Sequence, residues 1–115
     1  DHVDLRLDTA QLGTAMVVGV GGEIDVYSAP VLRDKLSELV ASGQHDLVVD
    51  LNEVSFMDST GLGVLVGTLK KIRTHEGSMD IVCARPRLLK IFQITGLAKV
   101  FSIYDTREAA LLGRS

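Results

Sequence analysis

Aromatic side chains are scarce in this 115-residue chain, which has no tryptophan, two tyrosines and three phenylalanines. Proteins that hold single-stranded nucleic acid commonly stack its bases on aromatic side chains, so the scarcity argues against that class. The 12 lysines and arginines stand against 15 aspartates and glutamates, and the formal net charge is -3. A phosphate backbone is bound through an excess of positive charge, which this chain lacks. The sequence therefore predicts no nucleic-acid partner.

Cysteine and long apolar runs are also scarce. Cys83 is the single cysteine, so no disulfide can form within the chain, and its apolar neighbours predict a buried free thiol. No segment approaches the ~20 apolar residues of a membrane span. The first residues lack the basic start and the apolar stretch of a secretory signal. These absences predict a cytoplasmic protein with no membrane partner.

The length limits the fold to one domain, expected over residues 1–115. The chain is too short for a barrel of eight strand–helix units or for a two-domain dinucleotide enzyme. Hydrophobic residues make up 46% of it and charged residues 23%, which predicts a folded core rather than disorder.

Hydrophobic periodicity predicts strands and helices in alternation. Strands are expected over 5–7, 15–20, 47–51, 81–84 and 100–103, and helices between 28 and 43, 58 and 77, 86 and 96, and 105 and 112. The first two strands should form a hairpin, residues 52–57 a loop, and the Ser28 hydroxyl should cap the first helix. After the hairpin each helix separates two strands, which predicts an α/β fold: a mostly parallel sheet of about five strands with one antiparallel edge and about four helices packed on it.

The most unusual segment is Asp58-Ser59-Thr60-Gly61-Leu62-Gly63, at the start of the second expected helix. Unpaired N–H groups at a helix start favour anions, and Asp58 or Ser59 can cap them. Capping leaves the glycines unexplained, because each interior glycine, including Gly67 one turn further on, costs about 1 kcal/mol relative to alanine. Either the helix packs closely on the sheet, at Gly63 and Gly67 for example, or bare backbone beside Ser59 lets another protein dock. Both explanations can hold at different glycines.

Nucleotide-binding motifs do not fit this segment. A dinucleotide fingerprint follows its strand directly, whereas the expected strand ends at Leu51, well before Gly61. The sequence has no Gly-x-x-x-x-Gly-Lys-Ser/Thr run that would form a phosphate-binding loop.

Catalytic and metal sites are not indicated either. A nucleophilic Ser59 would need a base, but His2, His45 and His75 are scattered over expected loops and ends. No ligand spacing typical of a metal site is present. The sequence therefore predicts a protein that is not an enzyme, with no catalytic residues, no cofactor and no metal.

One enzyme-like alternative stays open at this point. Asp50 closes an apolar strand, as does the phosphoryl-accepting aspartate of a two-component receiver domain. Such domains also need an acidic pair after the first strand and a lysine after the last. Neither is found here, although Glu23 and Asp25 follow the second strand. Acetyl phosphate with Mg²⁺ would label a receiver aspartate.

Taken together, these segments resemble the bacterial anti-sigma factor antagonists (anti-anti-sigma factors), which are built on the STAS domain. The runs that carry the resemblance are Gly22-Glu23-Ile24-Asp25, Ser28-Ala29-Pro30, Leu47-Val48-Val49-Asp50-Leu51, Val54-Ser55-Phe56-Met57-Asp58-Ser59-Thr60-Gly61-Leu62-Gly63-Val64-Leu65, Ile94-Thr95-Gly96-Leu97 and Val100-Phe101. They cover nearly the whole chain in order.

The resemblance implies partner switching in transcription regulation, as in bacterial stress responses. Such a protein binds an anti-sigma factor that is also a serine kinase of the GHKL ATPase type, and binding frees the sigma factor. Phosphorylation of Ser59, with Thr60 as the second candidate, would end binding, and a PP2C-like phosphatase would reset it. The residues expected to bind the partner are Asp25, Val26, Tyr27, Asp58, Ser59, Thr60, Gly61, Gly63 and Val64.

Some assignments stay open. Tyr27 and Val64 could be packing residues instead of contacts, and Lys70, Lys71 and Arg73 are interpreted as a solvated helix end rather than a binding patch. The chain is expected to be a monomer, with weak dimerisation left open. The alternative within the same fold is a STAS module that senses a ligand or nucleotide, or that assembles a signalling scaffold.

Overall fold

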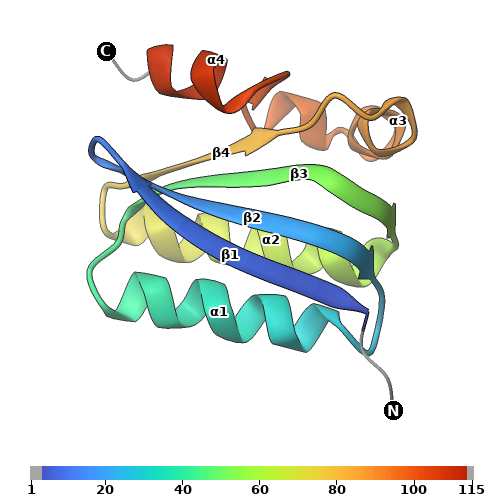
Figure 1. Cartoon of the computed structure of the whole chain (residues 1–115), viewed down its shortest axis with the longest axis horizontal. Helices are drawn as coiled ribbons and strands as arrows, with labels where there is room; N and C mark the ends of the chain where they lie inside the picture. Colours follow the sequence, from blue (N-terminus) through green and yellow to red (C-terminus); the bar gives the residue numbers. More distant parts are fainter. Residues whose placement is uncertain (1–3, 114–115) are drawn as a thin grey trace.

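The computed structural model describes residues 4–113, so His2 lies outside the described residues, as do both ends of the expected 1–115 domain. A five-stranded sheet is packed with helices on both faces (Figure 1). The elements in chain order are β1 (Leu5–Leu12), β2 (Ala15–Ile24), α1 (Ala29–Ala41), β3 (Asp46–Met57), α2 (Ser59–Thr74), β4 (Ser78–Val82), α3 (Pro86–Ile94), the 3₁₀ helix η1 (Leu97–Lys99), β5 (Ile103–Tyr104) and α4 (Arg107–Leu112).

The sheet has the order β1-β2-β3-β4-β5. β1 and β2 form an antiparallel hairpin that turns at Gly13, whose φ of 63° suits glycine, and the other three pairings are parallel. The helices α1 and α2 cover one face, and α4 lies on the opposite face (Figure 1). The predicted fold class is thereby confirmed, with the expected hairpin as the antiparallel edge.

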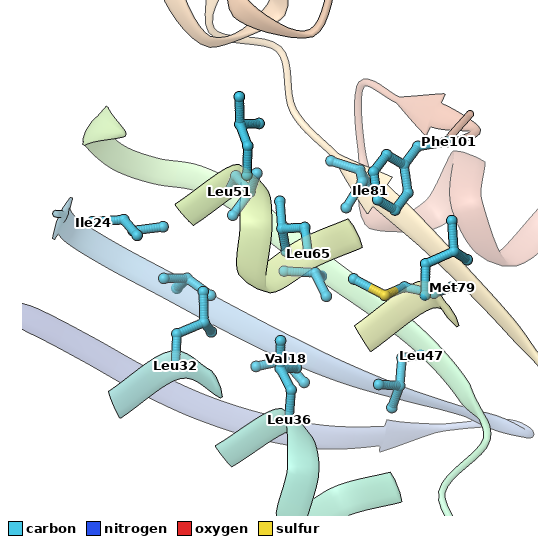
Figure 2. Packing of buried hydrophobic residues seen from close by; sticks show 14 of the residues in the cluster. Val18, Ile24, Leu32, Leu36, Leu47, Leu51, Leu65, Met79, Ile81 and Phe101 are labelled. Carbon is cyan, nitrogen blue, oxygen red and sulfur yellow. The ribbon is translucent and has the colours of Figure 1, made fainter. Parts of the chain in front are cut away.

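The main core lies between the sheet and the helices α1 and α2 (Figure 2). Its strand side is apolar because β2, β3 and β4 are central, and its helix side comes from residues spaced three and four apart. Fully buried members from the two sides include Val18, Leu47, Ile81, Leu32, Leu36 and Leu65. A smaller cluster on the other face joins β2, β3 and β4 to Ala110 of α4. Cys83 is buried and free, as expected.

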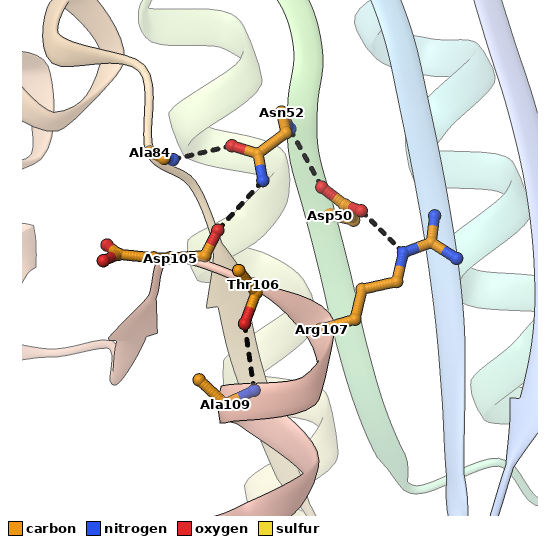
Figure 3. Close-up of polar contacts among 7 residues, drawn as sticks. All are labelled: Asp50, Asn52, Ala84, Asp105, Thr106, Arg107 and Ala109. Atoms are coloured by element: carbon orange, nitrogen blue, oxygen red, sulfur yellow. Dashed lines mark hydrogen bonds and ion pairs between the residues drawn. The ribbon is translucent and has the colours of Figure 1, made fainter.

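The short helix α4 is held to the sheet by polar contacts (Figure 3). The Arg107 guanidinium donates from Nε to Asp50 Oδ2 over 2.6 Å, an ion pair whose carboxylate is 14% exposed. The Asn52 side chain accepts from the backbone N–H of Ala84 at 2.6 Å and donates to the Asp105 carbonyl at 3.1 Å. These bonds link β3, the end of β4 and the approach to α4.

The structure corrects the expected loop over residues 52–57, which is the second half of β3. Polar Asn52 and Glu53 gave these residues the appearance of a loop. In fact β3 stays paired with β2 as far as Met57, and the pairing passes through two register shifts, between Gly19 and Gly21 and between Gly22 and Glu23 of β2. Val54 and Met57 face the core.

Other boundaries also move. The expected strand over 100–103 is reduced to β5 at Ile103–Tyr104 and is preceded by η1, while the strand expected over 81–84 begins earlier, at Ser78. The helix α2 ends at Thr74, before the expected stop at Gly77. The start of α4 is capped by Thr106, whose Oγ1 accepts from the backbone N–H of Ala109 at 3.1 Å.

Candidate functional site

The carboxyl ends of β2 and β3 lie side by side, because their last residues, Ile24 and Met57, are paired. The loop after β2 and the first turn of α2 are therefore neighbours. A hydrogen bond joins them, donated by the backbone N–H of Asp58 to the Ile24 carbonyl over 3.1 Å. In open α/β sheets this edge is where ligands usually bind. The sheet thus brings together two segments that the sequence singles out, residues 25–28 and 58–60.

The first turn of α2 is capped by Asp58, not by Ser59. The Asp58 carboxylate accepts from the backbone N–H of Thr60 at 2.9 Å and also from the Thr60 hydroxyl. This leaves Ser59 exposed at the first helical position, and within residues 4–113 its hydroxyl makes no hydrogen bond. Of the two hydroxyls, Ser59 is the one open to a reacting enzyme, because Thr60 is half-buried and already bonded.

The loop after β2 is ordered by its own polar groups. Asp25 Oδ1 accepts from the backbone N–H groups of Tyr27 and Ser28 at 2.9 and 3.0 Å. This turn pushes Val26 and Tyr27 outward, so that they are 58% and 77% exposed. Tyr27 is therefore not a packing residue. Ser28 does not cap α1 as expected, because its hydroxyl accepts from the Asp25 N–H and donates to the Glu23 carbonyl.

The hydrogen bonds in this loop predict a pH dependence. The N–H donated by Ser28 is the main cause that lowers the pKa of Asp25 below its ordinary 3.8, with Tyr27 adding to it and desolvation opposing it. A carboxyl whose folded pKa is depressed stabilises the fold above its ordinary pKa, and that stabilisation is lost as the pH falls through the folded value. We expect the amides of Tyr27 and Ser28 to lose protection from hydrogen exchange below pH 3.8, ahead of the amides of β2.

Asp25→Asn is the matched control, because the amide keeps an acceptor oxygen but does not titrate. In this variant the hydrogen-exchange rates of the Tyr27 and Ser28 amides should vary with pH only as the intrinsic rates of unprotected amides do. If the amides of Tyr27 and Ser28 in the wild-type chain lose protection only at the pH at which the amides of β2 do, the assignment of the pKa shift of Asp25 to these hydrogen bonds is wrong.

The glycines of α2 divide into two kinds. Gly61 is buried, and a Cβ there would lie 2.7 Å from Ile24 Cγ2 and 2.7 Å from Met57 Cγ, so it lets α2 approach the sheet. Gly63 and Gly67 are exposed, and a Cβ at either would meet nothing within 4 Å. Of the two explanations left open from the sequence, close packing on the sheet is therefore wrong for Gly63 and Gly67, and it holds at Gly61. As a result Gly61 can position Ser59 but cannot itself face a partner.

Val64 is half-buried and packs against the main core, so only part of it is available to a partner. Phe56 belongs to a run that carries the family resemblance but was not expected as a site residue. It is 50% exposed and lines an apolar hollow of about 310 Å³ beside α3. Strand alternation did not mark it, because Val54 and Met57 are both buried while Ser55 and Phe56 are both exposed, so the period of two is broken there.

The other chemistries considered from the sequence find no support in the geometry. Asp50 lies in the middle of β3, with one carboxylate oxygen bonded to Arg107 and the other to the Asn52 N–H, unlike a free acceptor at a strand end. His75 stacks on His45, with ring centroids 4.1 Å apart, and lies at the far end of α2, about 24 Å from Ser59 at 1.5 Å per residue. Neither histidine is placed to act as its base.

Between residues 4 and 113 no three histidine, cysteine, aspartate or glutamate side chains gather as metal ligands would. None of the helices in that range is long and apolar enough to cross a membrane.

The family model of the STAS domain matches residues 6–110, and the chain belongs to that family. An anti-sigma-B factor antagonist of Bacillus subtilis (strain 168) is 46% identical over 109 residues, 95% of this chain and 99% of that protein. One from Staphylococcus aureus (strain NCTC 8325 / PS 47) is 37% identical over 106 residues, 92% of this chain and 98% of that protein. The crystal structure of an anti-sigma factor antagonist from Mycobacterium paratuberculosis superposes with a TM-score of 0.88 at 33% identity, covering 95% and 92% of the two chains.

Proposed function

We propose that this protein is an anti-sigma factor antagonist, which binds an anti-sigma factor in its unphosphorylated form and so releases the sigma factor. The observation that carries the proposal is Ser59, whose exposed hydroxyl makes no hydrogen bond within residues 4–113 and lies at the first position of α2, on the sheet edge from which the exposed Val26 and Tyr27 also extend. The relatives from Bacillus subtilis and Staphylococcus aureus are both named anti-sigma-B factor antagonists, and this chain is similar to them over nearly their whole length.

The anti-sigma factor is proposed to be a serine kinase of the GHKL ATPase type. It would transfer the γ-phosphoryl group of ATP to Ser59 Oγ, with ADP as the leaving group and the hydroxyl proton passing to a base of the kinase. A PP2C-like phosphatase would hydrolyse the phosphoserine and restore the binding form. In this scheme the protein is a substrate and a regulator without catalysis of its own, and the exchange takes place in the bacterial cytoplasm.

The proposed contact surface consists of Asp25, Val26, Tyr27, Asp58, Ser59, Thr60, Gly63 and Val64, with Gly61 beneath them as a packing residue. It combines two exposed apolar side chains with two carboxylates, on the edge where β2 and β3 end. Exposed aromatic side chains such as Tyr27 are frequent anchors of protein interfaces.

The test is a capture experiment from the native host with the wild-type chain, Ser59→Ala and Ser59→Asp, read by mass spectrometry. We expect wild type and Ser59→Ala to retain a GHKL-type kinase and Ser59→Asp to lose it, because the added carboxylate must be buried unpaired against the partner. Thr60→Ala controls for the neighbouring hydroxyl, and circular dichroism should show all variants folded.

The outcome also separates the alternatives. If all variants capture the same proteins, or none, Ser59 is not the switch. The alternative of a ligand-sensing or scaffold module would then replace the proposed function.

A further inference from the structure

Between the helices α1 and α2 lies another hollow, which is open to solvent and separate from the one beside α3. It has a volume of about 280 Å³ and is lined by Arg33 of α1 and by Gly63, Val64, Gly67 and Lys71 of α2. We call it the α1–α2 groove. Gly63, Gly67 and Lys71 are spaced four residues apart, so they follow one line along α2.

Both walls of the α1–α2 groove are cationic. Lys71 Nζ donates to Ser37 Oγ across the two helices at 3.3 Å, a neutral partner that leaves its charge uncompensated. Arg33 lies 3.7 Å from Asp34, but both side chains are more than half exposed, so this pair is weak. The groove therefore offers two positive charges to a ligand lying between them.

The fold gives no reason for glycine at the floor of the groove. Neither Gly63 nor Gly67 has a positive φ, and an added Cβ at either would meet nothing within 4 Å. Alanine would favour the helix at both positions. What glycine does provide is a helix backbone that another chain can approach without a side chain in between.

The groove is also continuous with the proposed contact surface. Gly63 lies about one turn beyond Ser59, and the line from Gly63 to Lys71 extends about 12 Å further along α2 at 1.5 Å per residue. A partner that covers Ser59 would therefore reach Gly63, Gly67 and Lys71 along the same helix.

We propose that an acidic segment of the anti-sigma factor docks in the α1–α2 groove, close against Gly67, with its carboxylates beside Arg33 and Lys71. This inference rests on the proposed function, and it adds Arg33, Gly67 and Lys71 to the surface that recognises the partner. It also revises the interpretation of Lys71 as part of a solvated helix end.

The decisive variant is Gly67→Ala, because stability and binding should change in opposite directions. With nothing in contact at this position, we expect the midpoint of thermal unfolding to rise by about 4 °C. We expect the affinity for the purified kinase, the one retained by wild type and lost with Ser59→Asp, to fall at least tenfold in calorimetric titration. A gain in stability excludes misfolding as the cause of weaker binding.

Charge reversal tests the acidic nature of the occupant. Arg33→Glu and Lys71→Glu should each weaken binding at least tenfold at low salt. Lys70→Glu is the matched control: it makes the same change on the adjacent residue of α2, which is exposed but does not line the groove, and should change the affinity less than twofold. Raising the salt concentration should reduce the difference between Lys71→Glu and wild type.

The possible failures are distinguishable. If Ser59→Asp loses the kinase while Gly67→Ala binds like wild type, or while Lys71→Glu behaves like Lys70→Glu, the groove proposal is overturned and the proposed function stands. If Gly67→Ala changes only the self-association of the chain in sedimentation, the occupant is a second copy and the proposal is overturned. If Ser59→Asp still binds, the proposed function fails independently of the groove.

Discussion

Phosphorylation of Ser59 should weaken binding to the anti-sigma factor more than a hundredfold while the domain stays folded. The phosphate adds about -1.5 to -2 charges, next to the Asp58 carboxylate and on the same sheet edge as Asp25. A partner covering this edge would have to bury a dianion without a paired cation. A loss of about 3 kcal/mol is sufficient for the expected change, because about 1.4 kcal/mol corresponds to a factor of ten.

The same position explains why the fold should tolerate the phosphate. The Ser59 side chain is exposed and its hydroxyl makes no hydrogen bond within residues 4–113, so phosphorylation breaks no native hydrogen bond of that hydroxyl. At the first position of α2 the helix dipole favours a negative charge, by typically about 0.3–1 kcal/mol. We therefore expect the midpoint of thermal unfolding to remain unchanged or to rise slightly.

The measurement is a calorimetric titration of the purified kinase with the chain before and after enzymatic phosphorylation, with the site confirmed by mass spectrometry. Treatment with a PP2C-type phosphatase should restore the original affinity and so control for damage. Equal affinities of the two forms would contradict the switch. A fall in the unfolding midpoint of ten degrees or more would instead indicate that the phosphate acts by disrupting the fold.

The position of Ser59 could be predicted because it depends on local chemistry. A carboxylate followed by two hydroxyls at the start of an apolar helix signals an N-cap, and the structure shows which of Asp58, Ser59 and Thr60 does the capping. The sheet topology was likewise predictable, because strand and helix periodicities alternate along the chain. Both the helix start near Ser59 and the order of strands and helices can be inferred from residues that are close together in the sequence.

Contacts between distant segments were not predictable in this way. The pair of Asp50 and Arg107 joins residues 57 positions apart, and no pattern around either one identifies the other. The roles of the α2 glycines were missed for the same reason, because only the three-dimensional structure places Ile24 and Met57 against Gly61 and leaves Gly67 open. Sequence reasoning found that the glycines needed an explanation but could not assign one to each.

The length of β3 was also not predictable, because it depends on pairing with β2 and not on local propensity. Asn52 and Glu53 are typical of a loop, and local propensity favoured that interpretation. Pairing with β2 overrides it, since Val54 and Met57 gain burial in the core if the strand continues. Exposed Phe56 follows from the same extension, so the missed boundary also hid a residue of the site edge.

The largest loss of stability is expected for Phe92→Ala in α3. Phe92 is fully buried and meets Phe101 edge to face, with ring centroids 6.1 Å apart and planes at 86°. Truncating a buried phenylalanine to alanine typically costs about 3–5 kcal/mol. Domains of this size have a total stability of about 5–15 kcal/mol, so the variant should lose a large share of it.

Urea unfolding followed by far-ultraviolet circular dichroism measures this directly, as a lower midpoint at an unchanged slope. Ile94→Ala is the matched control, because Ile94 lies in the same helix but is 74% exposed, and its stability should change by no more than about 0.5 kcal/mol. Phe92→Leu should fall between the two, and a double-mutant cycle with Phe101→Leu separates the edge-to-face contact, about 0.5–1.5 kcal/mol, from the burial. If Phe92→Ala lost no more stability than Ile94→Ala, the packing of α3 through Phe92 and Phe101 would be contradicted.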